Sequence, residues 1–350
     1  MDTKILIQSF TEFAKQKNVD RPTMIKILQD VFRAMIKKKY ENDENFDIII
    51  NADNGDLEIM RFREIVDDNS EDIWDFDKIA ISDAKKIEED FIVGDEVAEE
   101  IKIEDFGRRA VILAKQTLIQ RVKDLEKEII ISKYDDLIGE IITGEIYQIL
   151  SREVLLVDIE GNEISLPRSE QIPKDRYRKG DSLRGIILSV EMFRGNPKIT
   201  LSRTNPKFLE KLFEKEVPEI FDGLITIKKI VREPGERAKI CVESYDDRID
   251  PVGACVGMNG SRIHSIVREL QNENIDVINF TENTDLYITR ALSPAKITSL
   301  KIEKENKRVS VYLKPDQVSL AIGKGGQNIK LASRLLDLEI DVFRELDGLQ

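Results

Sequence analysis

Two short glycine loops, each between segments of helical periodicity, are the parts of this sequence best suited to chemistry. They are Gly257-Met258-Asn259-Gly260 within CVGMNGSRIHSI, and Gly323-Lys324-Gly325-Gly326 within AIGKGGQNIKLA. A glycine can end a helix in a left-handed conformation that a Cβ would make costly. A helix that starts directly after such a loop offers unpaired N–H groups and the positive end of its dipole to an anion. A phosphodiester backbone could therefore approach the main chain closely at either loop.

The two loops belong to a duplicated unit. They lie 66 residues apart, and the apolar positions around the first loop recur at the same offset. The matched pairs are Val252/Val318, Val256/Ile322, Ile263/Ile329, Ile266/Ala332 and Leu270/Leu336. Ile275-Asp276-Val277 recurs as Ile340-Asp341-Val342 at an offset of 65, so one residue has been lost near the end of the second helix. A repeat of this kind predicts one structural unit used twice.

Each unit is predicted to run helix, strand, strand, helix, loop, helix, strand. A GxxG loop in this order of elements resembles the type II K-homology (KH) domain of bacteria, whose loop clamps about four nucleotides of single-stranded nucleic acid. For one loop alone, a tight helix–turn–helix used only for packing is the alternative. The repeat favours KH domains at residues 204–280 and 281–350, packed as a rigid pair with one continuous nucleic-acid track.

The predicted nucleic-acid contacts lie in the loops and on the helices that follow them. They are Gly257, Met258, Asn259, Gly260, Arg262, Gly323, Lys324, Gly325, Gly326, Gln327, Lys330 and Arg334. Lys324 is the clearest phosphate ligand, because it is the only charged residue in either loop. The long side chains after the loops are equally compatible with a solvated helix face. With so few charges, we expect modest affinity and a shallow salt dependence, with a slope of about −0.7 per phosphate neutralised.

Residues 137–203 predict a small β-barrel. Strands are indicated at Glu140–Ile149, Val154–Ile159, Glu163–Leu166, Ser182–Val190 and Lys198–Leu201. This pattern is typical of an OB-type barrel, and the segment resembles S1 domains, which bind single-stranded nucleic acids. S1 domains usually carry aromatic residues on the second and third strands, where this sequence has aliphatic residues and Pro167. Because Tyr147, Tyr177 and Phe193 are scattered instead, we expect a barrel that serves chiefly as a spacer and an electrostatic surface.

Residues 1–136 predict one α/β domain. A helix capped by Asp20 precedes a hairpin that starts near Phe46, and a long helix runs from about Asp105 to Ser132. Residues 1–140 carry 22 Lys/Arg against 34 Asp/Glu, so nearly all of the net charge of −13 lies there. An acidic domain repels nucleic acid, and we expect it to dock on a protein; a solvated acidic surface without a partner is the alternative.

Composition argues against several classes of protein. No apolar run approaches the ~20 residues of a membrane span, and the first residues lack the features of a signal peptide. Cys241 and Cys255 are expected in the core of a protein kept in a reducing compartment, so the cytoplasm is the expected location. The sequence has one His, no Gly-x-x-x-x-Gly-Lys-Ser/Thr phosphate loop and no Cys/His metal spacing, so we expect no enzyme activity, metal or cofactor.

The whole arrangement, an α+β multidomain chain with an acidic α/β domain, an S1-type barrel and two tandem type II KH domains, resembles the NusA family of bacterial transcription termination and antitermination factors. The resemblance is carried by REPGERAKICV at Arg232–Val242, DDRIDPVGACVGMNGSRI at Asp246–Ile263, AIGKGGQNIKLAS at Ala321–Ser333, KKKYE at Lys37–Glu41 and the FGR…AKQ…QRV pattern at Phe106–Val122. It extends over the whole chain and is strongest in the two KH units.

The resemblance implies a transcription factor whose N-terminal domain binds RNA polymerase near the RNA exit channel. It also implies that the barrel and both KH domains capture nascent single-stranded RNA, and that the protein modulates pausing, hairpin-dependent termination and antitermination. Other Nus factors are implied as partners, and we expect a monomer. The positions that correspond to basic residues near the RNA hairpin are Arg108 and Lys115, for which a solvated helix surface is the alternative.

Two other functions remain open from the sequence. S1 and KH modules also accompany ribonucleases, so an RNA-processing protein is one; turnover of single-stranded RNA with Mg²⁺ would identify it. A translation factor or RNA chaperone is the other, and co-sedimentation with ribosomes but not with polymerase would favour it.

Overall fold

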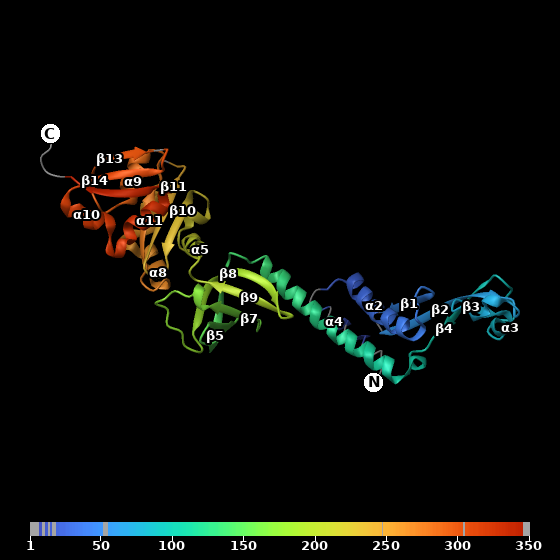
Figure 1. Ribbon diagram of the computed structural model, residues 1–350. Coiled ribbons are helices and arrows are strands. Elements are labelled where there is room, and N and C mark those ends of the chain that lie inside the picture. The colour runs from blue at the N-terminus through green and yellow to red at the C-terminus, as the bar shows by residue number, and fades with distance from the viewer. Residues whose placement is uncertain are drawn as a thin grey trace. The chain divides into compact units, whose positions relative to one another are not determined.

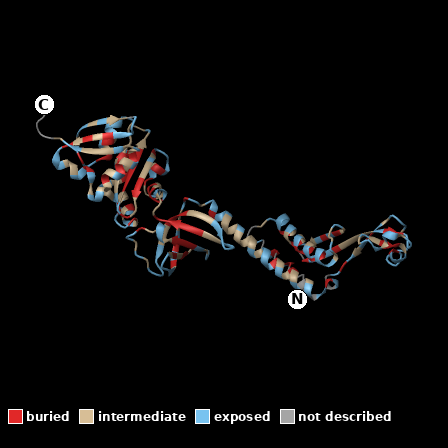
Figure 2. Ribbon diagram, viewed as in Figure 1, coloured by how far each residue is buried: buried red, intermediate tan, exposed pale blue. Residues whose placement is uncertain are grey.

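The protein has an α+β fold that divides into two compact units, residues 1–129 and 130–350 (Figure 1). The computed structural model describes residues 7–8, 11–12, 15, 19–51, 55–246, 248–303 and 305–345, and only the backbone of residues 103, 104, 108 and 111. Buried residues gather on the strands and on the helix faces that cover them (Figure 2). No helix in the described ranges has both the length and the apolar character needed to cross a membrane.

In the described residues of the first unit, helices pack with a four-stranded sheet. α2 begins after Asp20, whose carboxylate accepts a hydrogen bond from the Thr23 N–H at 3.1 Å, as the predicted cap requires. The elements are α2 (Arg21–Tyr40), β1 (Phe46–Asn51), β2 (Asp56–Val66), η1 (Glu71–Trp74), β3 (Lys78–Ala80), α3 (Ile81–Ala84), β4 (Glu96–Glu100), η2 (Ile103–Phe106) and α4 (Gly107–Asp135). β2 pairs with all three other strands, antiparallel to β1 and β4 and parallel to β3. Leu28, Phe46 and Leu118 form part of its core.

The second unit starts with the predicted five-stranded barrel. Its strands are β5 (Ile141–Ile149), β6 (Glu153–Val157), β7 (Glu163–Pro167), β8 (Ser182–Phe193) and β9 (Asn196–Ser202), with the turn η3 (Arg168–Glu170). They close in the order β5-β6-β7-β9-β8, so no edge strand is left open. Ile146, Leu156 and Leu201 fill the interior together with Tyr134 from the last turn of α4. The OB-type barrel is therefore confirmed.

Two copies of the predicted KH order follow. KH1 comprises α5 (Pro206–Glu216), α6 (Pro218–Phe221), β10 (Ile225–Glu233), β11 (Arg237–Ser244), α7 (Pro251–Val256), η4 (Met258–Gly260), α8 (Ser261–Glu269) and β12 (Asn274–Asn279). KH2 comprises α9 (Thr284–Ala291), β13 (Ile297–Glu303), β14 (Arg308–Leu313), α10 (Pro315–Ile322), η5 (Lys324–Gly326), α11 (Gln327–Leu336) and β15 (Glu339–Arg344). In each sheet the first two strands are antiparallel and the last strand is parallel to the middle one.

The two KH domains share a hydrophobic core. Val231, Cys241 and Ile278 on the sheet of KH1 pack with Leu331 and Leu335 of α11 in KH2. The KH2 helices thus cover the sheet face that the KH1 helices leave open. This confirms that the domains pack directly on each other; a continuous nucleic-acid track across them stays a prediction.

Buried charged residues fasten the barrel to KH1. Arg203, directly after β9, is 1% exposed and donates to Asp175 of the barrel at 2.7 Å and to Glu269 of α8 at 2.8 Å. Arg232 of β10 donates to Glu273 at 2.7 Å and to the Arg203 carbonyl, also at 2.7 Å. Because breaking a buried ion pair leaves an uncompensated charge, these contacts resist separation of the two domains.

Candidate nucleic-acid interface

The first glycine of each loop adopts a backbone that glycine alone adopts readily. Gly257 and Gly323 have φ of 75° and 73° with ψ of 168° and 173°. A Cβ added at Gly323 would lie 2.8 Å from the Cβ of Asn328, and one at Gly257 would lie 2.9 Å from the Cγ of Arg262. The sign of φ is as predicted, but ψ places both residues in the extended mirror region rather than in the left-handed helical region.

The helices that follow the loops start without a side-chain cap. α8 and α11 are preceded by Gly260 and Gly326, which have left-handed backbones and no side chain to accept a first-turn N–H. The starts of α2, α5 and α9 differ, since Asp20, Asn205 and Asn283 accept such hydrogen bonds there. The N–H groups of Ser261 and Gln327 donate to the carbonyls of Met258 and Lys324. No side chain caps the next N–H groups of α8 and α11, so these groups and the positive ends of the helix dipoles are available to an anion such as a phosphate.

Both loops lie at the surface. Met258 is 89% exposed, and Asn259, Lys324 and Gly325 are exposed as well. Asn259 and Gly325 occupy the same place in their loops and are both left-handed, with φ of 53° and 62°. Asn is one of the few residues with a side chain that tolerate this conformation, so the two loops have the same shape despite their different sequences.

The predicted contacts Lys330 and Arg334 lie together in a groove of KH2. Its volume is 490 Å³, and its lining residues are Glu233, Ile329, Lys330, Ser333, Arg334, Glu339, Ile340 and Asp341. The two basic side chains come from α11, whereas the carboxylates come from β15 and from the end of β10. The groove therefore offers cations for phosphates, while the carboxylates of Glu339 and Asp341 pair with Arg308 at 2.8 and 3.3 Å.

Arg262 was predicted as an RNA contact, but the structure engages its side chain within KH1. One guanidinium nitrogen donates to the carbonyl of Ala254 at 2.7 Å and to Glu219 of α6 at 2.9 Å. Asn328 holds the equivalent position in KH2 and donates to the carbonyl of Leu320 at 3.1 Å. Ala254 and Leu320 are also 66 residues apart, so Arg262 and Asn328 make equivalent hydrogen bonds to the helix before the loop. This hydrogen bond is the helix-to-helix tie of each domain.

The repeat points to an exposed basic residue that the sequence analysis missed. Arg268 of α8 lies 66 residues before Arg334, and both are exposed. His264 is in the same way the counterpart of Lys330, and both of these are exposed too. Applying the repeat offset to the predicted contacts in KH2 would have revealed both positions.

The KH2 loop lies close to the turn between β10 and β11 of KH1. Lys174 of the barrel pairs with Glu236 in this turn at 3.0 Å. This ion pair lowers the pKa of Glu236, and Gln327 and Lys324 at the KH2 loop act in the same direction. The barrel, KH1 and the KH2 loop thus meet around one carboxylate, so the predicted contacts Lys324 and Gln327 lie in a mixed-charge setting.

A second groove has walls from both KH domains. It has a volume of 560 Å³, and its lining residues are Val252, Val277, Ile278, Asn279, Thr289, Arg290, Ser293, Pro294, Ala295, Lys296 and Ile297. Val252 belongs to α7, the helix that leads into the KH1 loop. Arg290 and Lys296 supply positive charge on the KH2 side of this groove.

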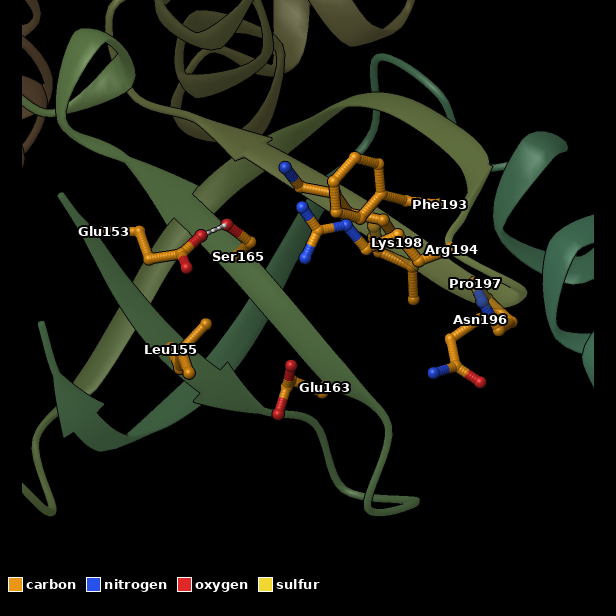
Figure 3. A pocket seen from close by; sticks show the side chains of 10 residues that line it. Glu153, Leu155, Glu163, Ser165, Phe193, Arg194, Asn196, Pro197 and Lys198 are labelled. Carbon is orange, nitrogen blue, oxygen red and sulfur yellow. Dashed lines mark hydrogen bonds between the residues drawn. The ribbon is translucent and has the colours of Figure 1, made fainter.

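The barrel carries an exposed aromatic residue beside a pocket of 290 Å³ (Figure 3). Phe193, at the end of β8, is 49% exposed, with the guanidinium of Arg194 5.2 Å and the ammonium of Lys198 5.1 Å from its ring centre. Leu155 and Ser165 come from β6 and β7. An aromatic ring flanked by cations can stack a base and hold its phosphate. That the barrel serves chiefly as a spacer and an electrostatic surface stays a prediction.

Of the two residues predicted near an RNA hairpin, Arg108 has a side chain outside the described residues. Lys115 lies on α4, and its side chain is half-buried. Within the described ranges, no three His, Cys, Asp or Glu side chains are grouped so that they could hold a metal ion.

Three family descriptions match successive parts of the chain. The NusA N-terminal domain matches residues 6–128, the NusA-like first KH domain residues 203–280, and the NusA-like second KH domain residues 284–348. Sequence similarity to other proteins extends over nearly the whole chain. The transcription termination/antitermination protein NusA of Halalkalibacterium halodurans is 37% identical over 343 residues, which are 98% of this chain and 88% of that protein. The chain belongs to the NusA family.

Further NusA proteins show the same extent of similarity. The protein of Bacillus subtilis is 36% identical over 98% of this chain and 91% of its own length, and that of Thermus thermophilus is 34% identical over 95% and 89%. The similarity spans the barrel and both loops, so the site described above belongs to the part that this chain shares with its NusA relatives.

Proposed function

We propose that this NusA-family protein is an RNA-binding transcription elongation factor. Its N-terminal domain binds RNA polymerase, and the barrel with KH1 and KH2 binds nascent single-stranded RNA. By holding both partners, the protein modulates pausing, intrinsic termination and antitermination. The domains that carry these roles are residues 1–136, 137–203, 204–280 and 281–350.

The observation that carries the RNA-binding part is the pair of exposed GxxG loops ahead of uncapped helices. In each domain, no side chain caps the first turn of the helix that follows the loop. Two such sites on domains that share a core can contact one strand at two places, which raises affinity without new contacts at either site. Lys324, Lys330 and Arg334 add charge in KH2, and Arg268 does so in KH1.

The polymerase part is supported by charge and by the family. Residues 1–140 carry nearly all of the net negative charge of the chain, which disfavours RNA as their partner. The relatives are named transcription termination/antitermination proteins. Arg108 and Lys115 on α4 are proposed to lie near the RNA that leaves the polymerase.

A charge reversal in the KH2 loop tests RNA binding. The double variant Lys324→Asp, Gly325→Asp places two carboxylates at the proposed phosphate site of the full-length chain. We expect single-stranded RNA to bind at least about tenfold more weakly in fluorescence anisotropy titrations, because like charges replace a cation and an open approach. The fold should survive, since a Cβ at Gly325 meets nothing within 4 Å and Asp is one of the few residues with a side chain that tolerate its left-handed φ of 62°.

Lys307→Asp is the matched control. Lys307 is exposed and left-handed in the turn between β13 and β14, with φ of 49°. Lys307→Asp reverses one charge as Lys324→Asp does, within KH2 but outside the loop, so the RNA affinity of this variant should change less than about twofold. Equal affinities of the loop variant and the wild type would contradict the assignment of the KH2 loop.

Crosslinking of the full-length protein in a paused transcription complex tests both partners together. We expect crosslinks to polymerase from the N-terminal domain and crosslinks to RNA from both GxxG loops. RNA crosslinks confined to residues 1–136, with polymerase crosslinks confined to the KH domains, would reverse the proposed roles.

A further inference from the structure

The single tryptophan of the chain is exposed on the first unit. Trp74 is 91% exposed at the end of η1, and the sequence contains no other tryptophan. An indole buries more apolar surface than almost any other side chain when it finds a partner, and tryptophan is enriched among the residues that dominate protein interfaces. Folding alone therefore does not explain why Trp74 is exposed.

Local contacts hold the segment that presents Trp74. The Ser70 hydroxyl accepts a hydrogen bond from the Asp72 N–H at 3.3 Å, and the Asp75 N–H donates to the Asp72 carbonyl at 2.9 Å. Two residues after Trp74, the chain is anchored to the core of the unit. The Phe76 ring lies 5.6 Å from that of Tyr40, and its carbonyl accepts a hydrogen bond from Arg61 at 2.7 Å. The exposed indole is thus mounted on an ordered turn.

The surroundings of Trp74 are strongly acidic. Residues 64–77 contain seven Asp or Glu and no Lys or Arg. Glu71, Asp72 and Asp75 are exposed next to the indole in sequence. Lys78, which follows this stretch, pairs with Asp72 at 3.5 Å, and Arg61 donates to the Phe76 carbonyl, so the carboxylates of the stretch outnumber these cations. This charge repels a nucleic acid and attracts Lys and Arg side chains.

We propose that Trp74 and its acidic surroundings form a docking site for a Lys/Arg-containing segment of a protein. An ammonium or guanidinium group can lie over the indole face while the adjacent carboxylates pair with it, and the aliphatic part of the same side chain packs on the ring. The partner that supplies this segment is RNA polymerase, and this identification rests on the proposed function.

Hydroxyl-radical footprinting of the full-length protein measures burial of the indole directly. Oxidation of the peptide that contains Trp74 is quantified by mass spectrometry with and without RNA polymerase core enzyme, so tryptophans of the polymerase do not interfere. We expect oxidation of Trp74 to fall several-fold with polymerase and to stay unchanged with a single-stranded RNA oligonucleotide. Phe221, which is 79% exposed on α6, serves as the reference aromatic residue.

Binding of variants to polymerase tests the energetic role. Trp74→Ala should weaken binding by about tenfold or more, as expected for a central aromatic contact. Glu71→Gln with Asp75→Asn should weaken binding at low salt and reduce its salt dependence, because screening then removes less attraction. Ile159→Ala is the matched control, since Ile159 is fully exposed between Asp158 and Glu160 of the barrel and lies outside the proposed site.

The outcomes separate this inference from the proposed function. If wild-type protein binds polymerase, yet Trp74 stays fully oxidisable and Trp74→Ala binds equally well, the docking site is wrong and the proposed function stands. If RNA rather than polymerase protects Trp74, the partner class is wrong. Absence of any binding between the wild type and polymerase would overturn the proposed function itself.

Discussion

KH1 and KH2 have the same backbone frame but fill one equivalent position with opposite chemistry. The paired strands place Arg232 of KH1 and Ile302 of KH2 at corresponding sites, opposite Ala238 and Val309. Directly before the last strand of each domain lie Glu273 and Leu338. KH1 thus holds an ion pair between Arg232 and Glu273 whose side chains are both 0% exposed, whereas Ile302 and Leu338 of KH2 are apolar and partly buried against its core.

The difference follows from the neighbours of each domain. Arg232 also donates to the carbonyl of Arg203 at 2.7 Å, where the barrel joins KH1. Glu273 also accepts the Gly235 N–H at 2.8 Å. An apolar pair could fill the same space but could not satisfy these backbone groups. The ion pair therefore belongs to the junction with the barrel rather than to the KH frame.

The sheet faces of the two domains show the same dependence on neighbours. Cys241 and Ile278 lie on the KH1 face that KH2 covers, and both are buried. The corresponding residues of KH2 are Tyr312 and Phe343, whose rings stack at 5.4 Å, and Phe343 is 45% exposed. On the KH1 sheet face, Cys241 and Ile278 pack with the KH2 helices; on the corresponding KH2 face, the Tyr312 and Phe343 rings stack on each other.

Exchanging the KH1 pair for the KH2 pair should give the largest effect. Arg232→Ile alone leaves Glu273 charged and buried, and should lower the free energy of unfolding by about 3–5 kcal/mol. Adding Glu273→Leu should recover most of this loss and leave a cost of about 1–2 kcal/mol for the backbone groups that lose partners. Urea unfolding of the full-length chain followed by circular dichroism measures both variants.

A double variant no more stable than Arg232→Ile would contradict this account. It would mean that the contacts of Arg232 with the barrel, rather than its pairing with Glu273, carry the energy. Ile302→Val in KH2 is a control for trimming a partly buried side chain at the equivalent position, and should cost about 1 kcal/mol.

Most of the fold followed from local patterns in the sequence. The strands of the barrel, both KH units and the long helix α4 were predicted close to their observed bounds, because periodicity, turn residues and the 66-residue repeat are all local or self-similar signals. The short elements η1, β3, α3 and β4 were not predicted, since each has too few residues for a periodic pattern.

The site was predicted less completely, because side-chain partners depend on distant parts of the chain. Arg262 looked available until Glu219, 43 residues away, was found beside it. Arg203 and Arg232 resemble surface residues in the sequence and prove to be buried. Arg203 of the barrel donates to Glu269 of KH1, and Arg232 of KH1 donates to the Arg203 carbonyl. Phe193 becomes a candidate for stacking a base only because the structure places Arg194 and Lys198 beside its ring.

The second comparison concerns the helix-to-helix tie made by Asn328 in KH2 and Arg262 in KH1. Asn328 is 0% exposed and donates to the carbonyls of Leu320 and Ala321 at 3.1 and 3.2 Å. Asn328→Ala should cost about 2 kcal/mol, because buried carbonyls lose their donor and a small cavity forms. Arg262 is partly exposed, so water can replace its contacts, and Arg262→Ala should cost about 1 kcal/mol.

Thermal unfolding ranks the two variants, and RNA titrations separate packing from binding. If Arg262 serves the tie alone, Arg262→Ala should leave the salt dependence of RNA affinity unchanged. A slope that becomes shallower by about 0.7 would instead restore Arg262 as a phosphate contact, as the sequence analysis predicted.

The smallest effect is expected from exchanging the loop residues that differ in charge. Met258 and Lys324 are both exposed and occupy the same place after the first loop glycine. Lys324→Met should weaken RNA binding a few-fold and make the salt slope shallower by about 0.7, since one phosphate contact is lost. Met258→Lys should do the reverse, because the uncapped start of α8 offers the same anion site. Anisotropy titrations across a range of KCl concentrations measure both slopes. If Lys324→Met changes the slope and Met258→Lys does not, the strand passes only over the KH2 loop, and the likeness of the two loops does not extend to their use.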